Sequence, residues 1–105
     1  MTAVTFFTEH EEIVGFYIAG HSTNDDKDVE GKTVCAAVSS AAYMTVNTVT
    51  EIIGAEVEAD VEDGEMKIRL LNKIGESQEI LKGFQLHIKE LAKQHKQRIK
   101  VISEV

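Results

Sequence analysis

The sequence predicts a single α+β domain, residues 1–105, in which a mixed sheet is covered by two helices in the order ββαββαβ. Three observations predict this fold. Two pairs of short apolar stretches are each joined by a turn, as in β-hairpins. Two longer stretches repeat their apolar residues at helical spacing, and a short β-branched stretch follows the second of them. A chain of 105 residues can bury one modest core and is too short for two domains.

The first hairpin is expected near the start of the chain. Ala3 to Thr8 alternates well enough to form a strand, and Ile13 to Ala19 is rich in β-branched and aromatic residues. Glu9 to Glu12 lies between these stretches as the turn. The second strand is expected to end at the pair Gly20-His21.

The first helix is predicted over 34–53, where apolar residues recur at helical spacing. Thr33 is the expected N-cap, and Gly54 is expected to end the helix. The segment before it, 22–32, has one large apolar residue, Val29, among many charged and polar ones. We therefore expect this segment to be a solvated loop.

The second hairpin is the clearest structural signal in the sequence. Apolar and charged residues alternate over 55–62 and again over 65–70, and Asp63-Gly64 between them favours a type I′ turn. A two-residue loop gives one register that satisfies both faces of the hairpin. It pairs Val57 with Leu70, Ala59 with Ile68 and Val61 with Met66 on a buried face, and Glu58 with Arg69 and Asp60 with Lys67 on a solvent face.

The second helix is predicted from an N-cap at Ser77 to about Gln94 or Lys96. A short strand from Arg98 to Ile102 follows it. The apolar stripe of this helix consists of Ile80, Leu81, Phe84, Ile88 and Leu91.

The net charge of −7 is unevenly divided along the chain. Residues 1–66 hold 14 acidic and two basic residues, whereas residues 67–105 hold nine basic and four acidic ones. The acidic half argues against a general nucleic-acid binder and suits a basic partner. A single cysteine forms no internal disulfide, and no stretch has the length of a signal peptide or a membrane span. We expect a cytoplasmic protein without a cofactor or a metal site, because no metal-ligand spacing and no phosphate loop occur.

The single cysteine, Cys35, is the candidate nucleophile. With Thr33 as N-cap, Cys35 falls in the first turn of the helix, where the helix dipole favours a thiolate and free amides can bind an oxyanion. His21, at a strand end, can exchange protons with the thiol. The alternative is that Cys35 is a small buried hydrophobic residue. Three further histidines (His10, His87 and His95) are expected at the surface or at its boundary.

Ser39 lies one helical turn after Cys35, on the same face of the predicted helix. Its hydroxyl can bind substrate, or it can be a small residue that permits close helix packing. The sequence leaves both interpretations open.

Two motifs, Gly20-His21 and Val34-Cys35-Ala36-Ala37-Val38-Ser39, resemble those of the Prp-type ribosomal-processing cysteine proteases. The resemblance extends over the whole chain in length and element order. It implies a small, cytoplasmic, homodimeric enzyme that removes the N-terminal extension of a large-subunit ribosomal protein by cutting after an aromatic pair. It assigns the nucleophile to Cys35 and the general base to His21, and it assigns site-shaping positions to Gly20 and Ser39.

Two positions depart from the pattern of this family. Ser22 stands where the family usually has alanine after the histidine, and Lys32 stands where it commonly has an aspartate before the cysteine. Asp28 or Glu30 could replace that aspartate and orient His21, or the enzyme could act as a Cys–His dyad alone. Ser22, Asp28 and Glu30 are kept as candidate supporting residues, together with Thr33.

The resemblance implies a basic ribosomal protein as substrate, with no direct contact to nucleic acid or membrane. Two other functions remain compatible with the residues. One is a non-catalytic ribosome-associated binding module in which Cys35 is structural. The other is a redox-sensing thiol, which would need a partner thiol because the chain has no second cysteine.

Overall fold

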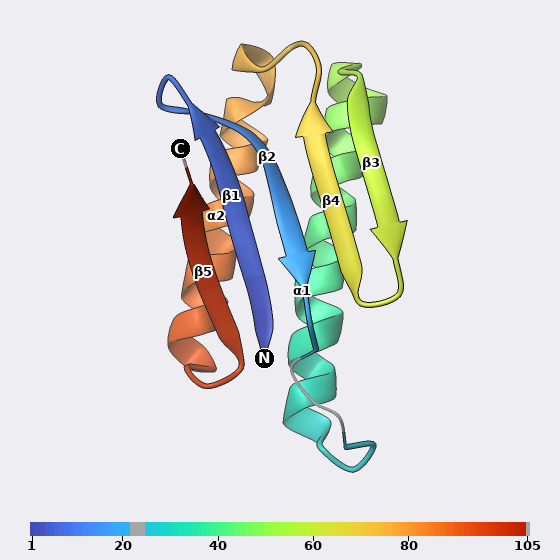
Figure 1. Ribbon diagram of the computed structural model, residues 1–105, viewed down its shortest axis with the longest axis vertical. Coiled ribbons are helices and arrows are strands. Elements are labelled where there is room, and N and C mark those ends of the chain that lie inside the picture. Colours follow the sequence, from blue (N-terminus) through green and yellow to red (C-terminus); the bar gives the residue numbers. More distant parts are fainter. Residues whose placement is uncertain (22–24, 105) are drawn as a thin grey trace.

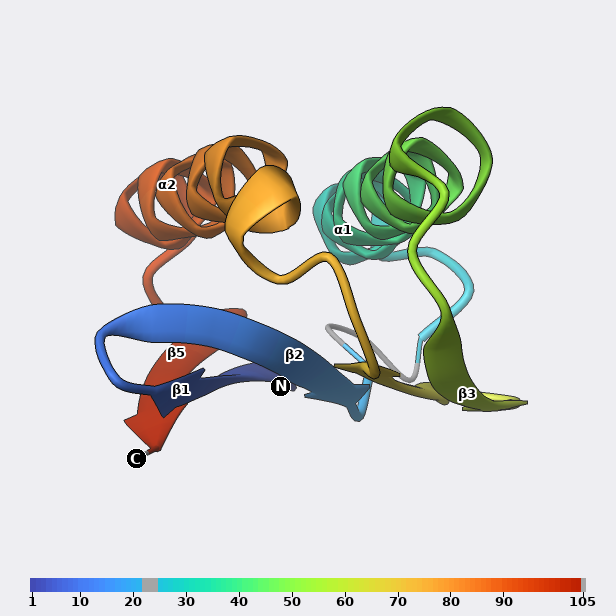
Figure 2. The same ribbon diagram turned by 90° about the horizontal axis from the view of Figure 1, so that it is seen from above.

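The computed structural model describes residues 1–21 and 25–104 and confirms the predicted α+β fold (Figure 1). Its five-stranded sheet has the order β3-β4-β2-β1-β5. Both helices pack on the same face of that sheet (Figure 2). The strands are β1 (Thr2–Glu9), β2 (Glu12–Ala19), β3 (Val57–Glu62), β4 (Glu65–Leu70) and β5 (Ile99–Glu104), and the helices are α1 (Val29–Asn47) and α2 (Gln78–Gln94).

The first hairpin and the last strand form the centre and one edge of the sheet. β1 and β2 pair antiparallel with Phe6 opposite Phe16, and their turn contains His10 and Glu11 at positive φ. β5 pairs with β1 in parallel, with Val4 opposite Val101. The sheet is therefore mixed, as the sequence predicted.

The core lies between the helices and the inner face of the sheet. The rings of Phe6, Phe16 and Phe84 meet there, with centroids 4.9 Å apart for Phe16–Phe84 and 5.6 Å apart for Phe6–Phe84. Gln78 is also buried, and it joins α2 to β2 because its amide accepts from Ile13 N and donates to Ile13 O, each at 2.8 Å. Buried amides are retained when both of their polar atoms are satisfied in this way.

The second hairpin has the predicted register but not the predicted turn or burial. Its pairs run from Val57–Leu70 to Glu62–Glu65. Gly64 has a φ of 78°, whereas Asp63 does not have the positive φ that a type I′ turn requires at both positions. β3 is an edge strand, and Val61 on its expected buried face is 50% exposed. The prediction of a buried face is therefore correct for β4, whereas in β3 only Val57 is partly buried against the core, and the prediction is wrong for Ala59 and Val61.

Helix α1 begins at Val29, five residues before its predicted start at Val34. Asp28 is the N-cap, and its carboxylate accepts from Gly31 N at 3.0 Å. Thr33 is an interior helical residue whose hydroxyl donates to Val29 O at 2.8 Å, so the prediction of Thr33 as N-cap is wrong. Asp28 is a better N-cap than Thr33 because its charged oxygen accepts hydrogen bonds from the free amides of the first turn.

The other end of α1 agrees with the sequence. The helix continues into a π-helical segment, Thr48–Ile53, and ends at Gly54 with a left-handed φ of 82°. Ser77 is the N-cap of α2, but its hydroxyl donates to Lys73 O instead of capping the helix. Within the described ranges, no helix is long and apolar enough to cross a membrane.

Candidate active site

A cavity of about 390 Å³ lies at the end of the sheet where β2 stops and the β3–β4 turn reverses. It is bounded by α1, by the end of β2 and by the second hairpin. Cys35 and His21 both line it. The other polar or flexible lining positions include Gly20, Ser39, Tyr43, Glu62, Asp63, Gly64 and Glu65.

His21 is held at this cavity by its backbone and by the β3–β4 turn. Gly20, with a φ of 88°, redirects the chain after β2, and its N–H donates to Gly64 O at 3.2 Å. The Met1 amino group donates to His21 O at 2.6 Å. The His21 ring packs directly on Gly64, because a methyl group there would lie 2.7 Å from Nε2. Only glycine combines this φ with this close approach.

Cys35 is partly buried and is the seventh residue of α1, in its second turn. The prediction that it lies in the first turn is wrong, because the helix starts at Val29. Amides beyond the first turn bond to carbonyls of the helix itself, and the dipole effect falls off within that turn. A helix-terminal oxyanion site beside the thiol is therefore not formed. Ser39 lies one turn further along and lines the same cavity.

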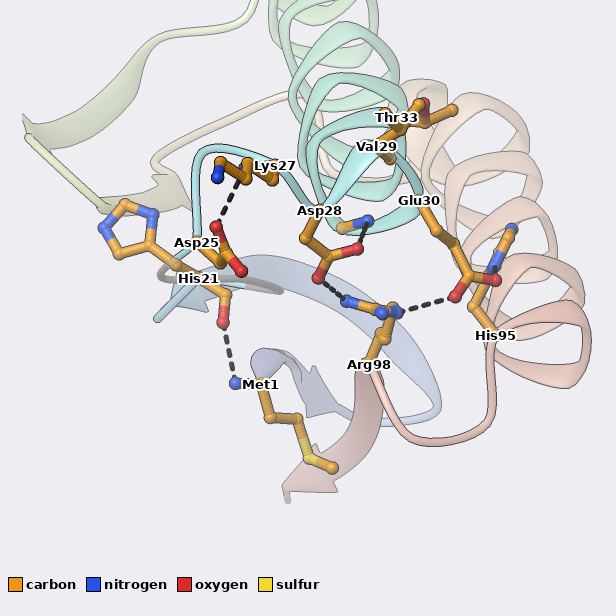
Figure 3. A network of polar contacts seen from close by, with 11 residues as sticks. Met1, His21, Asp25, Lys27, Asp28, Val29, Glu30, Thr33, His95 and Arg98 are labelled. Carbon is orange, nitrogen blue, oxygen red and sulfur yellow. Dashed lines mark hydrogen bonds and ion pairs between the residues drawn. The ribbon is translucent and has the colours of Figure 1, made fainter.

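The two candidate orienting acids, Asp28 and Glu30, face a different partner. Arg98 donates from Nη1 to Asp28 Oδ2 at 2.5 Å and from Nε to Glu30 Oε1 at 2.9 Å. Glu30 Oε2 also lies 3.0 Å from His95 Nδ1. Figure 3 shows both carboxylates directed at Arg98, whereas the His21 ring points away from them. The hydrogen bonds from His95 and then Arg98 lower the pKa of Glu30, and the bond to Asp28 is the main cause of a raised pKa at Arg98.

The electrostatic character of the cavity comes from the second hairpin. Glu62, Asp63 and Glu65 line it from the β3–β4 turn. On the sheet beside this hairpin, the pKa of Tyr17, which does not line the cavity, is raised by its hydrogen bond to Glu65, by desolvation and by the charges of Glu65, Asp60 and Glu62. A cavity with such a rim favours cationic or basic ligands.

Two further expectations concern Ser22 and a metal site. Ser22 lies outside the described residues. Within residues 1–21 and 25–104, no group of three or more His, Cys, Asp and Glu side chains is arranged to hold a metal ion.

A thiol and an imidazole at one cavity of an α+β sandwich are the two groups that a cysteine-dependent hydrolase requires. The chain belongs to the family described as cysteine protease Prp, whose sequence model matches residues 1–100. No curated protein matches the chain at a significant level.

Solved structures share the fold closely. A ribosomal processing protease, Prp from S. aureus, in complex with a covalently linked product peptide has 18% sequence identity and a TM-score of 0.87, over 99% of this chain and 100% of that one. The same values describe that protease in complex with a substrate peptide. The SMU.848 protein from Streptococcus mutans has 25% identity and a TM-score of 0.84, over 99% of both chains.

Sequence reasoning did not identify three residues that build this region. Gly64 was assigned only to a turn, although it also supports the His21 ring. Arg98 and His95 were assigned to a strand start and to a surface, although both hold Glu30. A local signal was present for Gly64 alone. The pairings with Glu30 join residues 65 and 68 positions apart, which no local pattern reveals.

Proposed function

We propose that this protein is a cysteine endopeptidase with Cys35 as nucleophile and His21 as general acid and base. The observation that carries the proposal is that the chain's single cysteine and His21 line the same cavity. Membership of the cysteine protease Prp family supports the reaction class. Because Asp28 and Glu30 face Arg98, we propose that the site acts as a dyad.

The reaction follows from these two groups. The Cys35 thiolate attacks the scissile carbonyl carbon, and the C–N bond breaks as the imidazolium of His21 protonates the leaving amine. A thioester joins Cys35 to the amino-terminal part of the substrate. His21, now neutral, takes a proton from water, and the hydroxide releases the acid and returns the thiolate. Ser39, on the same wall of the cavity, is available to hydrogen-bond the peptide backbone.

The proposed substrate is a basic large-subunit ribosomal protein that carries an N-terminal extension. The peptide complexes of the S. aureus ribosomal processing protease, which has the same fold, support this choice. The acidic rim formed by Glu62, Asp63 and Glu65 is complementary to a basic polypeptide. We further propose that the enzyme works in the cytoplasm as a homodimer.

The test is incubation of the extended ribosomal protein with the wild type and with Cys35→Ala and His21→Ala, followed by mass spectrometry of the products. Both variants should lose cleavage, and the wild type should form a thioester at Cys35 that trapping with hydroxylamine reveals. Cleavage that persists in Cys35→Ala would reject the mechanism. Binding of the ribosomal protein without any cleavage by the wild type would instead support a non-catalytic binding module.

A matched serine pair tests the role of Ser39. Ser39 lines the cavity, whereas its neighbour Ser40 lies in the groove between α1 and α2. Ser39→Ala should lower kcat/KM by roughly tenfold, the value of one lost hydrogen bond in a reaction. Ser40→Ala should cleave at the wild-type rate. Equal rates for all three proteins would show that Ser39 does not bind the substrate.

A further inference from the structure

Arg98 contacts both the first residues of the chain and the start of helix α1. It lies between α2 and β5, more than sixty positions after the residues that its side chain contacts. We propose that Arg98 is a positioning residue of the active site, which fixes the helix carrying Cys35 relative to the segment carrying His21. This inference rests on the proposed protease function for its catalytic readout.

The side chain of Arg98 binds two carboxylates at the start of α1. It binds Asp28, the N-cap, through Nη1, and it binds Glu30, in the first turn, through Nε. Asp28 uses its other oxygen to cap Gly31 N, so the residue that starts the helix is also the residue that Arg98 holds. The side chain of Arg98 is only 25% exposed, which reduces the screening of its charge by water. Because the planar guanidinium group binds two carboxylates, it fixes both the orientation and the distance of the helix start relative to Arg98.

The backbone of the same residue leads to His21. Arg98 O accepts from Thr2 N at 2.9 Å, and the preceding residue, Met1, donates its amino group to His21 O at 2.6 Å. Arg98 N in turn donates to His95 O at 2.9 Å, which closes the turn that presents the guanidinium. Figure 3 shows the contact of Met1 with the His21 carbonyl and that of Arg98 with Asp28.

These contacts form a continuous route from one reacting group to the other. It runs from His21 through Met1 and Thr2 to Arg98, and from Arg98 into the first turn of α1. Cys35 follows within the same helix. The route does not depend on the segment that joins His21 to Asp28 along the chain. A displacement of about 1 Å between reacting groups can lower a rate by roughly 100-fold. Loss of these contacts is therefore expected to lower kcat.

A second arginine provides a matched control. Arg69 forms an ion pair with Glu9 at the opposite end of the sheet, and its side chain is 46% exposed. Removal of that pair should affect stability slightly and leave the site intact. Arg69→Gln therefore removes the same chemical group without breaking the route between His21 and Cys35.

The experiment compares the full-length wild type with Arg98→Gln, Arg98→Lys, Asp28→Asn and Arg69→Gln. Asp28→Asn is included because asparagine keeps the N-cap and removes the charge that Arg98 binds. We expect Arg98→Gln to lower kcat about tenfold to 100-fold with KM changed less than threefold. Asp28→Asn should give a smaller loss of the same kind, Arg98→Lys should recover only part of the rate, and Arg69→Gln should stay within twofold of the wild type.

The outcomes separate this inference from the proposed function. If Arg98→Gln and Asp28→Asn cleave like the wild type, or lose activity only in proportion to the unfolded fraction seen in thermal unfolding, Arg98 is not a positioning residue. If Arg98→Gln does not fold, Asp28→Asn decides alone. If the wild type cleaves nothing, the protease function fails, and hydrogen exchange then tests whether Arg98 holds the start of α1. The amides of 29–35 should exchange faster in Arg98→Gln than in Arg69→Gln. Equal exchange in the two variants would overturn the inference.

Discussion

The two hairpin turns lie at opposite ends of the sheet (Figure 1). They differ in which residues adopt a positive φ. The β1–β2 turn has positive φ at His10 and Glu11, although neither is glycine. The β3–β4 turn has positive φ at Gly64, where glycine adopts it without steric cost. The turn that the sequence marked as type I′ lacks that conformation at Asp63, whereas the turn without glycine has positive φ at both central positions.

Of these two turns, the one with glycine is the one in which a neighbouring side chain needs the space. At Gly64 the His21 ring occupies the volume that a side chain would fill. At Glu11 the side chain is exposed, and the paired strands hold the turn despite the cost of its left-handed φ. We call the end with Gly64 and His21 the site end, and the end with His10 and Glu11 the far end.

The largest effect is expected from Gly64→Ala at the site end. The new methyl group would lie 2.7 Å from His21 Nε2, so the ring must move away from its position at the cavity. We expect kcat/KM for peptide cleavage to fall roughly 100-fold, and stability to fall by about 1–2 kcal/mol from the strained φ.

Gly54→Ala is the control for this prediction. Gly54 has a similar φ of 82°, but the nearest atom to an added methyl group is Lys73 Nζ at 3.5 Å, an ordinary contact. This variant should lose a comparable amount of stability in thermal unfolding and keep its cleavage rate. Equal loss of cleavage in both variants would show that backbone strain, and not the position of His21, causes the effect.

The fold could be predicted from the sequence because its strongest signals are local. The alternation on both sides of Asp63-Gly64 specifies every pair from Val57–Leu70 to Glu62–Glu65, because a shift by one residue exchanges the two faces. The exposure of β3 could not be predicted in this way. Alternation reports which residues share a face, but not whether a helix covers that face at the edge of the sheet.

The candidate site was predicted less completely, for a related reason. Cys35 and His21 were found from their residue types and motifs, and they line one cavity. The start of α1 was misplaced because Asp28 through Lys32 has the composition of a loop. That segment is helical because Asp28 caps it and because Arg98, seventy positions away, binds two of its carboxylates. A contact of that sequence separation leaves no periodic trace.

An intermediate effect at the site end is expected from acid. The pKa of Glu30 lies below its ordinary value of 4.5, because His95 and then Arg98 donate hydrogen bonds to its charged form. A carboxyl group whose folded-state pKa is lowered stabilises the fold above its unfolded-state pKa, and this stabilisation is lost as pH falls through the folded-state value.

The unfolding temperature of the wild type should therefore decline more steeply below pH 4.5 than that of Glu30→Gln, and the two curves should converge in stronger acid. Thermal unfolding followed by circular dichroism, in steps from about pH 6 to about pH 3, measures the difference. A difference between the two proteins that is constant over this range would contradict the pairing of Glu30 with His95 and Arg98.

The smallest effect is expected from Glu11→Gly at the far end. Glycine relieves the left-handed φ of 68°, worth about 1 kcal/mol, and part of this gain is offset by the greater freedom of the unfolded chain. We expect a net stabilisation of about 0.5 kcal/mol, a rise of roughly 2–4 °C in Tm, and no change in cleavage. Glu12→Gly is the control, because Glu12 lies in β2 without a positive φ and should lose stability by about 0.5–1 kcal/mol. If both variants lose stability equally, the far-end turn is not strained, and the contrast with Gly64 then depends on the His21 contact alone.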